Sequence, residues 1–148
     1  MAKQNTIVLP VDFSELSEAA VPWARRMAAV LDAEIHCVFV VEHPHFYGSL
    51  DMTTPIAIPT AEEIADSVKG QLISFVDEHF HGLQPAAKGE VLIGRPSEKI
   101  VDYARDCDAA AIVMTTHGYG GVKHVLLGST TEAVLRHAEC PVLSIRNT

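Results

Sequence analysis

The sequence predicts an α/β protein, a three-layer sandwich in which a five-stranded parallel sheet lies between two layers of helices. Five short apolar runs, typical of strands buried on both faces, alternate with segments whose apolar residues recur at helical spacing. Strands separated by helices pair in parallel through right-handed crossovers. A chain of 148 residues, 48% of them hydrophobic, is long enough for a sizeable core. We therefore expect one domain over residues 1–148.

The first strand is predicted over residues 6–11, TIVLPV, and a helix follows it. Ser14 is suited to cap that helix, and Glu15 and Glu18 fall in its positively polarised first turn. Apolar residues then recur every three or four positions as far as Leu31, which is typical of a helix with one buried face. That face is expected to comprise Leu16, Ala19, Ala20, Trp23, Met27, Val30 and Leu31. Residues 34–41 form the second predicted strand.

Residues 42–59 contain three prolines and one glycine, which predicts a long irregular connection, and such loops are often functional. Thr60 and Glu63 then have the spacing of a capping box at the start of a helix. The apolar face of this helix is expected to comprise Ile64, Val68, Leu72, Phe75, Val76 and Phe80. The middle of the chain is therefore predicted to be a loop followed by a long helix.

The rest of the chain alternates between strands and helices. Strands are predicted over residues 89–94, 109–116 and 140–146. Pro96 and Ser97 open a helix over residues 95–107. A second capping pattern, from Ser129 to Glu132, predicts a helix that ends near His137 or Ala138.

Charge and composition exclude several classes of protein. The net charge of −8 argues against a nucleic-acid-binding protein, which needs a basic face. No apolar run reaches membrane-spanning length and no signal peptide is recognisable, so we expect a cytoplasmic protein without membrane contact. The three cysteines are scattered, which is typical of reduced thiols in that compartment.

Polar residues follow the predicted strands where ligands bind in parallel sheets, beyond the carboxyl ends. Asp12 follows the first strand, and Gly118 follows the fourth. Gly128 and Ser129 then open the last helix, whose N-terminal amides and hydroxyls, including that of Thr130, have the chemistry to hold a phosphate. Taken alone, this pattern is equally that of a turn and a helix cap, and it is neither a Walker A sequence nor G-x-G-x-x-G.

Two long segments carry a family resemblance. TIVLPVDFSELSEAAVPWA, together with IVMTTHGYGGVKHVLLGSTTEAVLRHAECPVL, resembles the universal stress protein family from Thr6 to Arg146. Nucleotide-binding members of that family carry the motif G-2x-G-9x-G-[ST]. Gly118, Gly128 and Ser129 match this motif, whereas Thr115 occupies the position of its first glycine. The resemblance implies an adenine nucleotide alpha hydrolase-like, Rossmann-like fold.

The resemblance also implies a ligand and its contacts. The ligand would be ATP, with Mg²⁺ accompanying its phosphates. Asp12 would contact the nucleoside, and Pro10, Val11, Val41 and Met114 would line the adenine slot. The nucleotide-binding residues implied in this way are Pro10, Val11, Asp12, Val41, Met114, Thr115, His117, Gly118, Gly128, Ser129 and Thr130. A homodimer through the last strand and an unidentified regulatory protein partner are implied as well.

Three functional hypotheses remain open at this point. The first is an ATP-binding regulator that signals its nucleotide state to partners. The second, favoured by Thr115, is a stress protein that acts by protein–protein contact without a nucleotide. The third is an enzyme, but no nucleophile is paired with a base and no carboxylate pair is evident, so any ATP hydrolysis is expected to be slow. Neither His43-x-His45 nor His79-x-His81 has further ligands at metal-binding spacing, and no metal site is predicted.

Overall fold

The computed structural model describes residues 4–44, 57–116 and 127–146. These residues form the predicted five-stranded parallel sheet, with strand order β3-β2-β1-β4-β5. The strands are β1 (Asn5–Pro10), β2 (Ala33–Val41), β3 (Lys88–Ile93), β4 (Ala111–Thr115) and β5 (Val142–Ile145). The helices are α1 (Glu15–Glu18), α2 (Val21–Leu31), α3 (Ala61–Phe80), α4 (Pro96–Asp106) and α5 (Ser129–His137).

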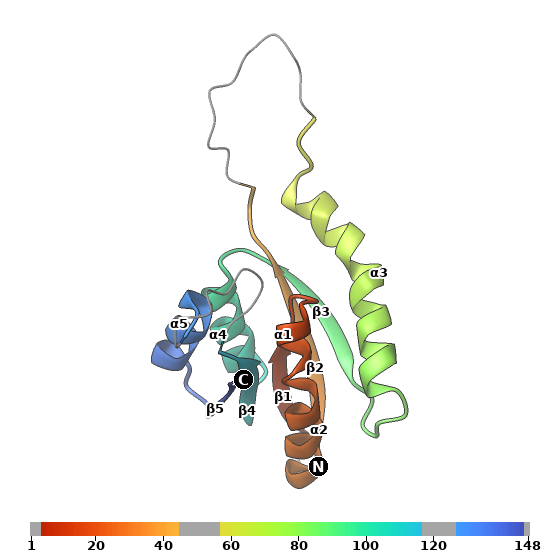
Figure 1. The fold of residues 1–148 in the computed structure, drawn as a ribbon, viewed down its shortest axis with the longest axis vertical. Coiled ribbons are helices and arrows are strands. Elements are labelled where there is room, and N and C mark those ends of the chain that lie inside the picture. Colours follow the sequence, from red (N-terminus) through yellow and green to blue (C-terminus); the bar gives the residue numbers. More distant parts are fainter. Residues whose placement is uncertain (1–3, 45–56, 117–126, 147–148) are drawn as a thin grey trace.

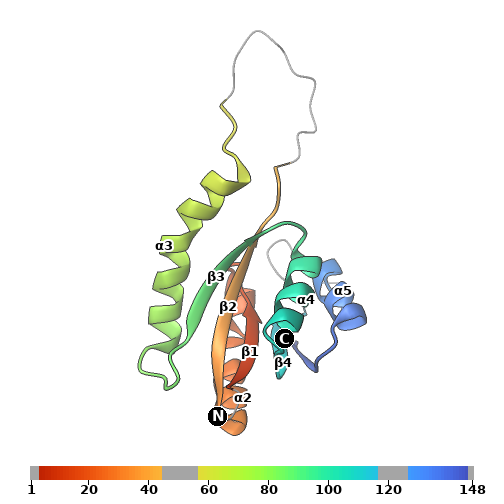
Figure 2. The ribbon, with the colours of Figure 1, turned by 180° about the vertical axis from the view of Figure 1, so that it is seen from behind.

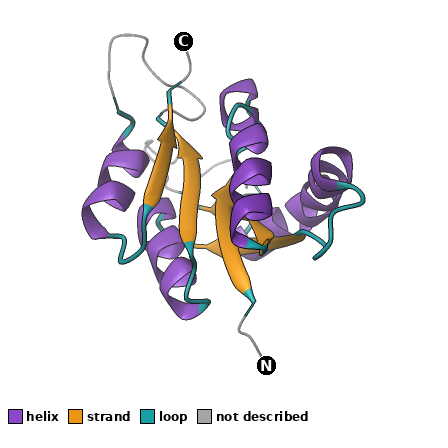
Figure 3. Cartoon of the chain, turned by 90° about the horizontal axis from the view of Figure 1, so that it is seen from below, coloured by secondary structure: helices purple, strands orange, loops and turns teal. Residues whose placement is uncertain are grey.

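Helices cover both faces of the sheet, as the three-layer prediction requires (Figures 1 and 2). Side chains alternate along β1: Ile7 and Leu9 pack in one core cluster with α2 and α3, whereas Val8 packs in another with α4 and α5. Figure 3 shows the strands with helices on both sides of them. The continuous apolar run that predicted β1 is thus explained by burial on both faces.

The predicted helix after β1 is broken into two, and this part of the prediction was wrong. Pro22 has no N–H to donate to the carbonyl of Glu18, so the α-helical ladder stops there. The amides of Ala19 and Ala20 instead bond three residues back, to Leu16 and Ser17. The phase of α2 therefore differs from that of α1.

Because of this change of phase, the buried face of α2 differs in part from the predicted one. In α2 the buried side chains are Val21, Ala24 and Ala28. Trp23 and Val30, expected in the core, are 42% and 80% exposed. Trp23 instead packs under the guanidinium of Arg26 at 4.9 Å. The small alanines allow α2 to lie close to the sheet, and Met27 and Leu31 pack against the core as predicted, whereas Trp23 and Val30 do not.

The two predicted capping boxes have different outcomes. At α3 the box is confirmed: the Glu63 amide donates to Thr60 Oγ1 at 3.2 Å, and the Thr60 amide donates to Glu63 Oε2 at 2.8 Å. At α5 it is wrong, because the N-cap is Gly128 and Ser129 is already the first helical residue. The start of α5 therefore has no capping side chain at its N-cap position, a difference that matters for the site.

Strand boundaries moved by at most two residues. The first strand, expected over residues 6–11, runs one residue earlier. The last strand, expected to begin at Cys140, begins at Val142 because Pro141 cannot donate to the ladder. Strand β5 lies at one edge of the sheet, next to β4. Within the described ranges no helix is both long and apolar enough to cross a membrane.

Candidate functional site

The winding of the sheet changes direction between two neighbouring strands, β1 and β4. From β1 the chain moves outward to β2 and β3, and it then returns through α4 to β4 on the other side of β1. Ligands of open α/β sheets bind beyond the carboxyl ends of the strands at such a point. The register Val8↔Ile112, counted four residues onward, brings Asp12 level with Thr116. The predicted polar residues after β1 and β4 therefore share one edge of the sheet.

Asp12 is held by the turn that follows β1. Its Oδ1 accepts hydrogen bonds from the amide and from the hydroxyl of Ser14, at 3.0 and 2.5 Å. Ser14 is also the N-cap of α1, as predicted, and its Oγ accepts from the Ser17 amide at 3.1 Å. The carboxylate is thus fixed to the start of a helix rather than free to rotate.

The end of β4 is bonded directly to the start of α5. The Gly128 amide donates to the Thr116 carbonyl at 2.7 Å, and the buried hydroxyl of Thr131 donates to the Thr115 carbonyl at 2.9 Å. The Thr116 amide in turn donates to the Ile145 carbonyl of β5 at 2.9 Å. These three bonds place the N-terminus of α5 at the carboxyl edge of the sheet.

The first turn of α5 has the polarity that an anion requires. The first amides of a helix have no partner within it, and they carry the positive end of the helix dipole. Gly128 contributes no side chain as a cap, Ser129 is exposed, and Thr130 is half-buried. The acidic side chain in this turn, Glu132, forms an ion pair with Arg136 at 2.9 Å. The arrangement can receive a phosphate without a cluster of basic side chains.

The remaining predicted contacts are spread along the same edge. Val11 and Val41 are buried on the face covered by α1–α3, at the ends of β1 and β2. Met114 is buried on the face covered by α4 and α5. Pro10, the last residue of β1, is half-buried. His117 and Gly118, which belong to the predicted site, lie outside the described residues, as does His45. The adenine slot thus remains a prediction.

A second polar group lies in the amino-terminal half of β2. His36 Nε2 is 2.7 Å from Glu34 Oε1, and its Nδ1 is 2.9 Å from the hydroxyl of Tyr103 on α4. Burial, with the nearby carboxylates as a smaller cause, raises the pKa of Tyr103 to about 12. The phenol therefore stays protonated near neutral pH. We interpret Glu34, His36 and Tyr103 as a hydrogen-bonded polar contact between the sheet and α4.

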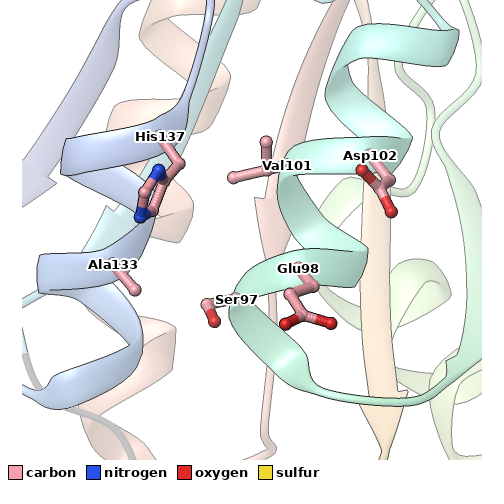
Figure 4. A pocket seen from close by; sticks show the side chains of 6 residues that line it. All are labelled: Ser97, Glu98, Val101, Asp102, Ala133 and His137. Atoms are coloured by element: carbon pink, nitrogen blue, oxygen red, sulfur yellow. The ribbon is translucent and has the colours of Figure 1, made fainter.

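A groove of about 280 Å³ separates α4 from α5 (Figure 4). Its lining consists of Ser97, Glu98, Val101, Asp102, Ala133 and His137. The two carboxylates are paired on their own helix: Glu98 with Arg95 at 3.3 Å, and Asp102 with Arg105 at 2.9 Å. The groove does not include the residues at the ends of β1 and β4, and we assign no ligand to it.

The histidines of the described ranges and the three cysteines offer little for catalysis. His79 packs against the ring of Phe75 at 4.3 Å, and His81 pairs with Asp77 at 3.3 Å, so the two imidazoles have different surroundings. No group of three or more metal-binding side chains occurs in the part of the chain that the structure describes. Burial raises the pKa of Cys37 to about 12 and also raises those of Cys107 and Cys140. No thiol is activated as a nucleophile.

Two important residues were missed from the sequence. Thr131 was treated only as part of a capping pattern, yet its hydroxyl joins α5 to β4. Phe13 was not singled out, although it has a positive φ of 63° immediately after Asp12. The Asp-x-Ser spacing around Phe13 is a signal for a local side-chain turn, and it could have pointed to this geometry.

We expect Thr131→Val to lower the stability of the protein by about 1–2 kcal/mol, because valine has the same shape but leaves the Thr115 carbonyl without this donor. Thermal unfolding followed by circular dichroism measures the change. Thr130→Val is the matched control on the same turn, since its half-buried hydroxyl has no hydrogen bond within the described residues. Equal unfolding temperatures for the two variants would contradict the role of this bond.

Comparisons with known proteins agree on one family. The family model described as "Universal stress protein family" matches residues 4–146. A curated universal stress protein of Methanocaldococcus jannaschii is 32% identical over 146 residues, which are 95% of this chain and 81% of that protein. The solved universal stress protein UspA from Lactobacillus plantarum is 27% identical with a TM-score of 0.76, and the match covers 99% of this chain and 100% of that one.

One further solved relative is a complex with a ligand. It is the universal stress protein from Archaeoglobus fulgidus in complex with dAMP, and it covers 98% of this chain and 99% of its own. Its TM-score is 0.62 and its sequence identity is 23%, a level at which the likeness shows the fold.

Proposed function

The chain belongs to the universal stress protein family, and from that premise we propose that it is a cytoplasmic regulatory protein that binds ATP with Mg²⁺. The observation that carries the proposal is the start of α5. This helix has a glycine as its N-cap, is bonded to the end of β4, and lies at the same edge of the sheet as Asp12. A relative with the same fold has been solved with dAMP, an adenine nucleotide.

Each chemical part of the proposed ligand has its own set of contacting residues. The amides of the first turn of α5 and the hydroxyls of Ser129 and Thr130 would hold the phosphates, and Mg²⁺ would offset their charge. Asp12 would accept a hydrogen bond from a nucleoside hydroxyl. Apolar contact with adenine would come from the ends of β1, β2 and β4. The glycine-loop residues His117 and Gly118 complete the proposed set from outside the described ranges.

The proposed activity is binding and signalling rather than turnover. A bound nucleotide that favours one arrangement of the segments around the site shifts the population toward it and changes the surface offered to a protein partner. No activated nucleophile occurs among the described residues, so ATP hydrolysis is expected to be slow. Turnover above about one per minute that is lost on changing Asp12 would instead identify an enzyme.

The direct test is calorimetric titration of nucleotide-stripped protein with Mg-ATP. We expect a dissociation constant in the micromolar range, which corresponds to about 8 kcal/mol of binding free energy. Parallel titrations with AMP and cAMP show how much of the binding free energy depends on the terminal phosphates. Absence of binding at millimolar nucleotide would sink the proposal.

The alternative is a nucleotide-independent stress protein that acts through a protein partner. The observation that favours it is Thr115, a buried residue at the end of β4 where the family's binding motif has glycine. Under this alternative, wild type does not bind and Thr115→Gly creates or sharply raises the affinity. If wild type already binds and Thr115→Gly changes nothing, the alternative loses its support.

We also propose that the protein forms a homodimer through β5. This strand is at the edge of the sheet, and its residues Val142–Ile145 are all half-buried within one chain. An apolar edge strand offers unpaired backbone groups to a second copy. Light scattering at micromolar concentration should give twice the mass of one chain, and a monomer would contradict this proposal.

A further inference from the structure

Phe13 has a backbone conformation that its residue type disfavours. Its φ is 63°, in the left-handed region. Among the described residues, the other non-glycine residues with positive φ are Asp32 and Asp108, both at 49°. Aspartate visits this region readily because its short side chain can bond locally, whereas a bulky residue is a genuine outlier there. Such outliers persist only when the surroundings hold them, and they cluster at functional sites.

Two aromatic rings hold Phe13 in place. Its ring stacks on that of Phe39 of β2, with centroids 4.8 Å apart and planes at 17°. It also meets the ring of Phe75 of α3 edge-on, at 5.9 Å and 61°. Both geometries are favourable for aromatic pairs. The left-handed turn is therefore maintained by packing in the core below it.

The same turn orients the carboxylate of Asp12. The amide and hydroxyl of Ser14 reach back across Phe13 to Asp12 Oδ1. The chain turns at Phe13, and in this structure the left-handed conformation of Phe13 lies between the donor and the acceptor of both bonds. A continuous series of contacts thus runs from the Phe39 ring, through the backbone of Phe13, to the carboxylate at the edge of the sheet.

We infer that Phe13 is a positioning residue for the nucleotide site: its ring, stacked on Phe39, fixes the direction of the Asp12 carboxylate. The inference rests on the proposed function for its consequence in binding, but the local geometry can be tested without a ligand. Phe13 itself need not touch the nucleotide, since it acts through Asp12. The stacked pair would thereby set how well the site is preorganised.

The test removes the stacking partner and leaves the turn chemically unchanged. In Phe39→Leu we expect the dissociation constant for Mg-ATP to rise about tenfold, the size that loss of an aromatic pair can produce. Phe13→Leu, on the other side of the stack, should change binding in the same direction. Phe39→Tyr keeps a ring and should restore wild-type affinity.

Phe80→Leu is the matched control, because Phe80 is buried in the same core cluster and its ring contact is with His79 rather than Phe13. It should lower the unfolding temperature about as much as Phe39→Leu and leave the dissociation constant unchanged. Unchanged affinity in Phe39→Leu, or an equal loss in Phe80→Leu, would overturn the inference.

A second readout separates this inference from the proposed function. Hydrogen exchange of the Ser14 amide, which donates to Asp12, reports the turn directly. It should be faster in Phe39→Leu than in wild type or Phe80→Leu. If wild type binds no nucleotide, the proposed function fails and this exchange rate alone decides: equal rates in the two leucine variants would refute the positioning role.

Discussion

Gly128→Leu is expected to weaken Mg-ATP binding about 100-fold while the protein stays folded. Gly128 has φ −69° and ψ 156°, a conformation that any L-residue adopts, so leucine introduces no backbone strain. Its side chain would instead occupy the space in front of the first turn of α5. Loss of two hydrogen bonds to a charged phosphate, at about 1.5 kcal/mol each, corresponds to about 100-fold in affinity.

Calorimetric titration measures this effect, and circular dichroism checks the fold. Arg95→Leu is the matched control, because Arg95 is the N-cap of α4, has φ −76° and likewise forms no capping side-chain bond. It places the same side chain at a helix start outside the proposed site, and affinity should be unchanged. Wild-type affinity in Gly128→Leu would remove α5 from the site.

Gly89→Val is expected to destabilise the protein by about 2 kcal/mol, because it overpacks the contact between β3 and α3. A Cβ at Gly89 would lie 2.9 Å from Leu72 Cγ and 3.5 Å from Val76 Cγ2. Leu72 is itself buried, at 2% exposed. For a domain of this size the unfolding temperature should fall by about 6 °C.

Gly70→Ala, on α3, is expected to change the stability in the opposite direction. A Cβ at Gly70 meets no atom within 4 Å, and glycine inside a helix costs about 0.5–1 kcal/mol relative to alanine. This substitution should therefore raise the unfolding temperature, again measured by thermal denaturation. If Gly89→Val is as stable as Gly70→Ala, the close approach of α3 to β3 is not the reason for glycine at position 89.

The parallel sheet and the layers were predictable because each rests on local patterns and a strong topological rule. Apolar runs identified the strands, and helical spacing identified the segments between them. The break before α2 was missed because the apolar spacing continues across it, while Pro22 acts on the hydrogen-bond ladder rather than on that spacing. Trp23 and Val30 were then placed on the wrong face as a direct result.

The common edge of the candidate site residues was predictable, whereas their supporting contacts were not. Asp12 and Gly128 could be assigned to one edge because parallel strands end together. The bond from Thr131 to Thr115 and the stack of Phe13 on Phe39 join residues far apart in the chain, and only the packed structure brings them into contact. The cap of α5 was misassigned because Ser129 and Gly128 both suit that position, and residue type alone does not choose between them.

Thr116 joins the end of β4 to two later elements. Its amide donates to the Ile145 carbonyl of β5, and its carbonyl accepts from the Gly128 amide at the start of α5. Without β5, the Thr116 amide would lose this acceptor, and the bond to the start of α5 would have less support. The geometry at the carboxyl edge of β4 therefore depends on a strand that contributes none of the proposed ligand contacts.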